Sequence, residues 1–191
     1  MASPPTRILL ISGSLRAGST NTALLRTAEA VAPEGTMALI YEGLGRLPHF
    51  NPDDDIAPLH PSVADLRTRT ADADALLFST PEYAGALPGS FKNLLDWTVG
   101  GGETYGMPVA WINASGSTTG AADAHRSLRT VLGYTGSAIV EEACAHIPVA
   151  RSAVGSDGLI GDEVIRRQIA AVLRTLASEV GNRVQSSGQL G

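Results

Sequence analysis

Cysteine is nearly absent from this chain, and its scarcity excludes a disulfide-stabilised fold. Cys144 is the single cysteine in 191 residues, so an internal disulfide cannot form. It has neither an adjacent histidine nor a Cys-x-x-Cys partner, so we expect an inert, partly buried thiol. The four histidines, at positions 49, 60, 125 and 146, show no metal-ligand spacing such as HExxH. We therefore expect no intrinsic metal site.

Excess basic charge and long apolar runs are also lacking. The 14 Lys and Arg residues are outnumbered by 19 Asp and Glu, and the formal net charge of -5 attracts neither nucleic acid nor an anionic membrane. No apolar run reaches the roughly 18 residues that span a bilayer. The N-terminal MASPPT lacks the charged region and apolar core of a signal peptide. We expect a cytoplasmic protein that acts on small molecules, without a nucleic-acid or membrane partner.

The composition predicts one domain. With 43% hydrophobic and 17% charged residues, a chain of this length buries one substantial core. Neither an internal repeat nor a linker divides it. We therefore expect a single domain over residues 1–191, with frayed polar ends at residues 1–6 and about 184–191.

Apolar runs alternate with helical patterns along the chain. Five runs are typical of strands buried on both faces of a parallel sheet: residues 7–12, 37–41, 75–79, 107–113 and 137–142. Helical spacing follows each of them, over residues 21–32, 62–72, 88–97, 121–132 and 162–180. This order predicts an α/β fold, a doubly wound sheet of five parallel strands flanked by helices on both faces. Ligands bind such sheets at the carboxyl ends of the strands, so we expect the site in the loops there.

The loop after the first run, GSLRAGSTN at residues 13–21, has the features of an anion site. A helix N-terminus offers unpaired N–H groups, Gly13 and Gly18 permit close approach, and Arg16 supplies a planar fork. Further hydroxyl and amide groups come from Ser14, Ser19, Thr20 and Asn21. The loop lacks both the lysine of a P-loop and GxGxxG, which favours a phosphate monoester over a pyrophosphate. The alternative is that these residues only cap the helix and that Arg16 is solvated.

The loop after the third run, within STPEYAGALPGSFKNLLDW at residues 79–97, places an aromatic ring at the sheet edge. Pro81 and the Ala-Gly pair predict a turn, and Tyr83 would lie against a planar heteroaromatic ring. The backbone N–H groups of residues 82–85 would meet the polar edge of that ring. Glu82 either accepts hydrogen bonds that fix the loop or is simply solvated. Asp96 and Trp97 end the following helix and have structural roles.

These two segments together resemble the NADPH-dependent FMN reductase family, flavodoxin-like proteins that include quinone, chromate and azo reductases. The likeness spans nearly the whole chain, and two motifs at matching places are more specific than either alone. The resemblance implies that the FMN phosphate is held by Ser14, Arg16, Ser19 and Asn21, with Thr20 nearby. It implies an isoalloxazine site lined by Pro81, Glu82, Tyr83 and Gly85, with Ala84 between them. Family members often carry asparagine at that position, whereas Ala84 offers no side-chain amide.

The loop after the fourth run, at residues 113–129, again carries small and hydroxyl side chains. We expect Ser115, Gly116 and Ser117 to close over the ribityl chain or the ring edge of the flavin. His125 and Arg126 would serve as proton donor and cofactor clamp, or would face solvent or a neighbouring subunit. The acidic run at residues 53–55 lacks the spaced ligands of a calcium loop, so we expect it to be solvated.

The resemblance implies an FMN-dependent NAD(P)H oxidoreductase that passes hydride through FMN to flavins, quinones or similar acceptors. The cofactors would be FMN and NADPH or NADH, and no catalytic side chain is required because the flavin performs the redox step. One alternative is a flavodoxin-type electron carrier that does not oxidise nicotinamide. Another keeps the fold but binds a sugar phosphate or nucleotide in place of flavin. Homodimers or homotetramers are common in the family, and exposed Trp97, Tyr105 and Met107 would supply an interface.

Overall fold

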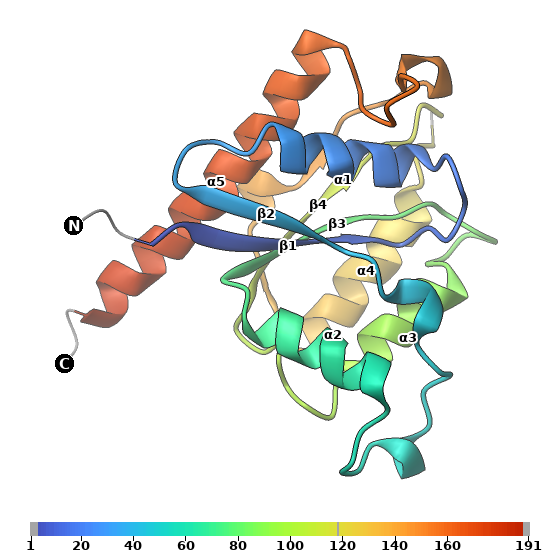
Figure 1. The fold of residues 1–191 in the computed structure, drawn as a ribbon, viewed down its shortest axis with the longest axis vertical. Coiled ribbons are helices and arrows are strands. Elements are labelled where there is room, and N and C mark those ends of the chain that lie inside the picture. Colours follow the sequence, from blue (N-terminus) through green and yellow to red (C-terminus); the bar gives the residue numbers. More distant parts are fainter. Residues whose placement is uncertain (1–3, 118, 189–191) are drawn as a thin grey trace.

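A single parallel sheet organises the computed structural model, which describes residues 4–117 and 119–188. The strand order is β2-β1-β3-β4-β5, so the direction of winding reverses between β1 and β3 (Figure 1). The strands are β1 (Thr6–Ser12), β2 (Thr36–Tyr41), β3 (Ala75–Ser79), β4 (Pro108–Asn113), β5 (Ala138–Ile139) and β6 (Ala145–His146). The predicted doubly wound parallel sheet is confirmed.

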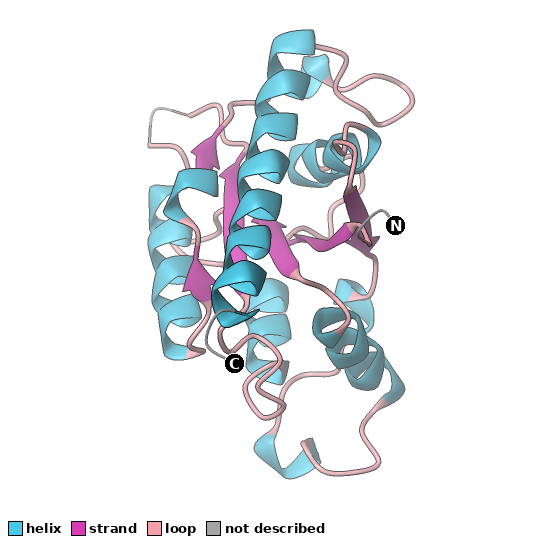
Figure 2. Ribbon diagram, turned by 90° about the vertical axis from the view of Figure 1, so that its left-hand side faces the viewer, coloured by secondary structure: helices cyan, strands magenta, loops and turns pink. Residues whose placement is uncertain are grey.

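Helices cover both faces of this sheet and give it two apolar cores. Figures 1 and 2 show α1 and α5 on one face and α2, α3 and α4 on the other. Their bounds are α1 (Thr20–Ala30), α2 (Pro61–Ala71), α3 (Gly89–Trp97), α4 (Ala122–Tyr134) and α5 (Glu163–Gly188). All five residues of β3 are buried, as expected for a central strand whose two faces both meet helices.

The fifth predicted strand, residues 137–142, is wrong in its extent. Only Ala138 and Ile139 pair with β4, a 3-10 turn follows at Glu141–Ala143, and β6 then pairs further along β4. Both glutamates of the turn are exposed, and Glu141 forms an ion pair with Arg129 of α4. Carboxylates cannot lie in a strand buried on both faces without a partner, so the chain leaves the sheet at this point.

The last helix extends further than the predicted end at residue 180. Glu179 accepts a hydrogen bond of 2.9 Å from Arg183 Nε, one turn later, and Ser186 Oγ donates to the Asn182 carbonyl. These local bonds continue α5 to Gly188, through part of the segment expected to fray. No helix in the described part of the chain, α5 included, is long and apolar enough to cross a bilayer.

Trp97 is buried, contrary to the expectation that it is exposed at an interface. It is 1% exposed, its ring meets Phe50 edge-on at 5.0 Å, and its Nε1 donates to the Pro48 carbonyl. The end of α3 thereby anchors the loop that follows β2. Tyr105 is 80% exposed, so only it and partly buried Met107 remain from the predicted interface.

Asp55 is not solvated as predicted for residues 53–55. Its carboxylate lies 2.7 Å from Arg67 Nη2, and Glu103 Oε1 lies 3.5 Å from Arg67 Nε. The three side chains are 12 to 13% exposed. Arg67 Nε and Nη2 also donate to the Trp97 carbonyl at 3.0 and 2.8 Å. A guanidinium on α2 therefore joins two loops that lie apart in the sequence, whereas Asp53 and Asp54 are exposed.

Candidate functional site

A cleft of about 410 Å³ opens at the carboxyl edge of the sheet. Its size falls within the roughly 300–1,000 Å³ typical of small-molecule sites. It brings together residues from all three loops singled out in the sequence: Thr20, Asn21, Pro81, Glu82, Ser115, Gly116 and Ser117. Arg16 and Ser19 line an adjoining hollow beside the first loop. Ser14, Tyr83, Ala84 and Gly85 lie outside the walls of both hollows.

The first loop is shaped by a glycine at which no side chain fits. A Cβ on Gly13 would lie 2.2 Å from Thr80 Oγ1, and the Gly13 N–H donates to the Ser79 carbonyl at 2.9 Å. The close contact of Gly13 with the end of β3 thus fixes the path of the chain from β1 into the loop. Gly18 has a φ of +68°, and Ser19 caps α1 by accepting from the Thr22 N–H. Ser19 therefore caps the helix, as the alternative expects, but the cap does not make this its only role.

Asn21 is fixed in the floor of the cleft. Its Oδ1 lies 2.9 Å from Ser79 Oγ, which also lies 2.8 Å from the Ile112 carbonyl. Asn21 and Ser79 are both buried. The first turn of α1 is thereby attached to β3 and β4, which holds the helix N-terminus at a set position over the cleft.

The loop after β3 forms a two-residue turn, as its Ala-Gly pair predicted. The Tyr83 N–H donates to the Ala86 carbonyl and the Ala86 N–H returns the bond to Tyr83, at 3.1 and 3.0 Å. Ala84 and Gly85 have φ values of 51° and 71°, as a type I′ turn requires. The Tyr83 ring is 55% exposed and is therefore free to contact a planar ligand.

Glu82 accepts hydrogen bonds that tie this loop to the next one. Its Oε2 accepts from the backbone N–H groups of Asp123 and Ala124, both at 3.0 Å. These groups begin α4, whose N-cap residue Ala121 has a φ of 53° and no side-chain cap. Of the two interpretations of Glu82, the structure supports the acceptor that fixes a loop.

The loop after β4 is closed by its own polar side chains. Asn113 Nδ2 donates to the Gly120 carbonyl, and Asn113 Oδ1 accepts from the Ser115 N–H at 3.0 Å. Ser117 Oγ accepts from the Gly120 N–H, and His146 Nε2 lies 2.7 Å from the Ser115 carbonyl. Ser115 and Ser117, which line the cleft, are therefore held by hydrogen bonds to other described residues of this loop and to His146.

His125 and Arg126 do not line the cleft. His125 is 8% exposed, and its Nδ1 lies 2.8 Å from the Ala121 carbonyl. Burial lowers the pKa of this imidazole, which disfavours its charged form. Arg126 is exposed and pairs with Asp123 on the same helix. The structure therefore places neither side chain in the wall of the cleft.

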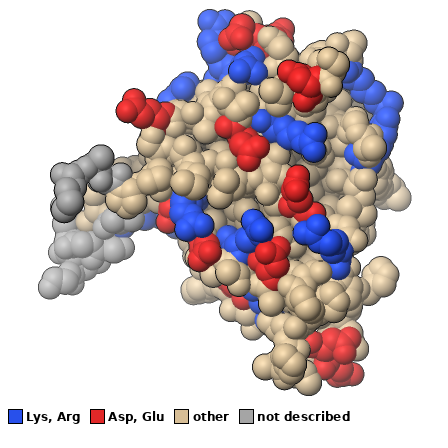
Figure 3. All heavy atoms as spheres, in the orientation of Figure 1, with Lys and Arg blue, Asp and Glu red and all other residues tan. Residues whose placement is uncertain are grey.

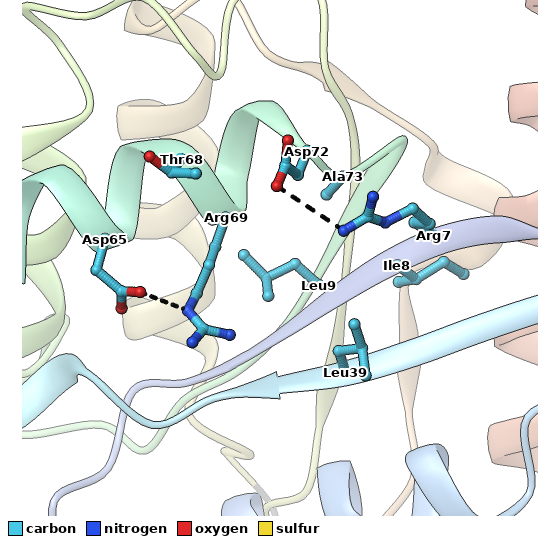
Figure 4. Close-up of a pocket in the computed structure, with 9 residues that line it drawn as sticks. All are labelled: Arg7, Ile8, Leu9, Leu39, Asp65, Thr68, Arg69, Asp72 and Ala73. Carbon is cyan, nitrogen blue, oxygen red and sulfur yellow. Dashed lines mark hydrogen bonds and ion pairs between the residues drawn. The ribbon is translucent and has the colours of Figure 1, made fainter.

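The remaining candidates contribute little to the site. Burial raises the pKa of the Cys144 thiol to about 11, in agreement with the inert thiol expected there. Another hollow lies between α2 and the strands β1 and β2 (Figure 4). Its arginines are engaged, because Arg69 pairs with Asp65 at 2.8 Å and Arg7 lies 3.9 Å from Asp72.

Sequence reasoning missed several residues of the cleft wall. They are Thr80, Ala114, Thr119, Ala121, Val149 and Arg151. Most of them adjoin residues that were singled out. Val149 and Arg151 belong to an irregular segment after β6 for which periodicity gives no signal.

Comparison with known proteins places the chain among flavin-dependent reductases. The profile of the family described as NADPH-dependent FMN reductase matches residues 6–151. An NAD(P)H-dependent FMN reductase of Pseudomonas aeruginosa is 34% identical over 172 residues, covering 89% of this chain and 92% of that protein. A 2-hydroxy-1,4-benzoquinone reductase of a Burkholderia species is 32% identical over 181 residues, covering 93% and 97%. The solved structure of the NAD(P)H:acceptor oxidoreductase FerB from Paracoccus denitrificans superposes with a TM-score of 0.81 at 29% identity, covering 93% and 98%.

Proposed function

Since this chain belongs to the NADPH-dependent FMN reductase family, we propose that the cleft at the carboxyl edge of its sheet is where NAD(P)H reduces quinone-type acceptors through FMN. The protein is an FMN-dependent NAD(P)H oxidoreductase. The observation that carries the assignment of the cleft is the convergence of three separate loops on one hollow. That position is where doubly wound sheets bind their ligands.

The residues of the first loop fit a phosphate monoester. The N-terminus of α1 presents N–H groups, and Arg16 has no carboxylate within ion-pair distance among the described residues. Gly13 keeps the backbone free of a side chain where it turns into the loop. The residues that would hold the FMN phosphate are Ser14, Arg16, Ser19, Thr20 and Asn21.

The loop after β3 fits the polar edge of a flavin ring. Tyr83 uses its N–H within the turn, but the N–H groups of Ala84 and Gly85 have no acceptor in the described part of the chain. These two N–H groups would be available to stabilise negative charge on a reduced ring. The ring would be lined by Pro81, Glu82, Tyr83, Ala84 and Gly85. The carboxylate of Glu82 acts here through the loop that it holds.

The loop after β4 would complete the enclosure, with Ser115, Gly116 and Ser117 along the ribityl chain. Bound FMN supplies the hydride chemistry, and the side chains of this chain bind and orient it. Hydrogen bonds that hold these loops serve this purpose, because an oriented ring needs less rearrangement before each transfer. One open face of the ring is enough for donor and acceptor to use in turn.

The test is a spectrum followed by an anaerobic titration. Purified protein is loaded with FMN, freed of excess flavin, and mixed with NADPH without oxygen. Loss of the flavin absorption band, and its return when benzoquinone is added, would support the proposed function. Bound flavin that NADPH and NADH leave oxidised would show an electron carrier instead. Protein that retains no flavin at any FMN concentration would overturn the cofactor assignment.

We further propose a single-domain cytoplasmic enzyme that assembles as a homodimer or homotetramer. Tyr105 and Tyr134 support assembly, because they are 80% and 91% exposed and large aromatic side chains are enriched at interfaces. Acidic and basic side chains alternate on the face shown in Figure 3, which offers no continuous basic surface for nucleic acid. Light scattering on the FMN-loaded protein would measure the assembly directly.

A further inference from the structure

Arg151 lies in the wall of the cleft and belongs to none of the three loops discussed above. It shares that wall with Thr20 and Asn21 at the N-terminus of α1, and with Ser115 and Gly116 after β4. Arg151 is exposed and begins a 3-10 turn at Arg151–Ala153. A residue that carries a guanidinium therefore borders the cleft near the N-terminus of α1.

The segment that carries Arg151 is anchored on both sides. Before it, the N–H groups of Ile147 and Val149 donate to the carbonyls of Asn113 and Ala114, at 2.9 and 3.0 Å. After it, a bridge joins Val154 to Ile160. The Ile160 N–H in turn donates to Thr27 Oγ1 of α1 at 2.9 Å. The backbone of Arg151 is thus held between the end of β4 and the helix whose N-terminus faces the cleft.

The charge of Arg151 is not neutralised by the protein. Within the described residues, no carboxylate lies within 4.0 Å of Arg151, nor of Arg16 and Arg26, which line the adjoining hollow. Several arginines elsewhere on this acidic chain are paired, as Arg69 is with Asp65 and Arg129 with Glu141. Arg46, Arg167 and Arg174 also lack an ion pair among the described residues, but they lie outside the cleft wall. Glu82 is the carboxylate in the cleft wall, and its Oε2 is engaged by α4.

We propose that Arg151 is a phosphate-binding residue of the cleft and takes a phosphomonoester dianion. The inference rests on the proposed function, because it assumes that a phosphorylated cofactor enters this cleft. Arg151 lines the cleft beside the N-terminus of α1, and Arg16 lines the adjoining hollow. A guanidinium presents a fork suited to phosphate oxygens, and its charge favours a dianion. The phosphate belongs either to FMN or to the ribose 2′ position of NADPH, and the same variant distinguishes these two sources.

The binding arm compares FMN with riboflavin, which lacks the phosphate. Flavin fluorescence is titrated with wild type, Arg151→Ala and Arg151→Lys, and with Arg174→Ala as a control for an exposed arginine on α5 outside the cleft. If FMN is the source, Arg151→Ala weakens FMN binding about tenfold or more, as loss of a charge-assisted hydrogen bond should. Riboflavin binding stays unchanged, lysine restores part of the affinity, and Arg174→Ala behaves as wild type.

The kinetic arm uses enzyme saturated with FMN. If the 2′-phosphate of NADPH is the source, Arg151→Ala raises the KM for NADPH about tenfold while the KM for NADH and the affinity for FMN stay unchanged. The proposal would be overturned if Arg151→Ala had wild-type affinities for FMN and riboflavin and wild-type KM values for NADPH and NADH. Equal weakening of FMN and riboflavin binding would also overturn it, because that result indicates a structural effect. Failure of the proposed function looks different, because the wild type itself would then bind no FMN or would hold FMN that neither NADPH nor NADH reduces.

Discussion

Glu82 Oε2 lies 3.0 Å from the backbone nitrogen of Ala124, a residue 42 positions later in the chain. The same oxygen accepts from Asp123, so a carboxylate of the β3 loop supplies the cap that α4 lacks. Two walls of the cleft are therefore joined by one side chain. The strength of this joint can be measured.

Glu82→Ala should lower the free energy of unfolding by about 0.5–2 kcal/mol, the usual cost of losing a helix cap. Glu82→Gln keeps an acceptor oxygen and should lose less. Urea denaturation of both variants gives the comparison. Alanine and glutamine variants of equal stability to wild type would show that the two hydrogen bonds contribute nothing to folding.

Arg16→Ala should weaken FMN binding and leave the turnover of fully loaded enzyme nearly unchanged. Arg16 would contact the phosphate, which is remote from the reacting ring. The measurement is the flavin content after gel filtration, followed by NADPH oxidation at saturating FMN. Equal flavin content in wild type and variant would contradict the role given to Arg16.

Gly13→Ala should destabilise the protein by about 1–3 kcal/mol, the usual range for overpacking. The new Cβ would lie 2.2 Å from Thr80 Oγ1 and 2.7 Å from Thr80 Cβ. Gly161→Ala is the matched control, because a Cβ there meets nothing within 4 Å. Thermal unfolding should separate the two substitutions, and similar melting temperatures would argue against a close contact at Gly13.

Arg67→Ala should cost about 3–5 kcal/mol, because it leaves two largely buried carboxylates without their partner. Arg69→Ala removes a solvent-exposed pair with Asp65 from the same helix, and should cost about 1 kcal/mol or less. Chemical denaturation at low ionic strength measures both. A loss for Arg67→Ala no larger than that for Arg69→Ala would refute the importance of the buried cluster.

His125 should make the protein less stable in weak acid. Burial lowers the pKa of its imidazole in the folded state, so the unfolded chain binds the proton more readily. The stability that depends on neutral His125 is present above the unfolded pKa of about 6.5 and is lost as the pH falls toward the lower folded value. His125→Gln should flatten the dependence of unfolding free energy on pH between about 7 and 5. An unchanged slope would exclude His125 as its source.

The sheet and the three loops were predictable because their signals are local. Apolar runs such as ALLFS stand out from their surroundings, and small or hydroxyl residues follow them. The sequence left two interpretations of Glu82 open, and its partners were not predictable because they lie more than 40 positions away. Arg151 was not found because an irregular segment carries it to the cleft, held by backbone bonds that no side-chain pattern records.

Trp97 and Asp55 were misjudged for a related reason. Trp97 was given a structural role but was also expected to be exposed at an interface, and an acidic residue between prolines is usually solvated. Each instead contacts a partner from another segment, Trp97 the Pro48 carbonyl and Asp55 the Arg67 guanidinium. The type of a residue indicates only its average exposure. Whether a particular side chain is buried against a partner is shown only by the tertiary structure.

The two edges of the sheet differ in how readily they could pair with another strand, because the strand beside β4 is interrupted. β2 is a continuous edge of six residues, with Met37 and Leu39 partly exposed along it. On the opposite side, β5 and β6 contribute two residues each and are separated by a helical turn. Such a broken edge is a poor template for adding a strand from another chain, and natural proteins use this device against aggregation. Growth of amyloid-like contacts from the folded state would therefore begin at β2.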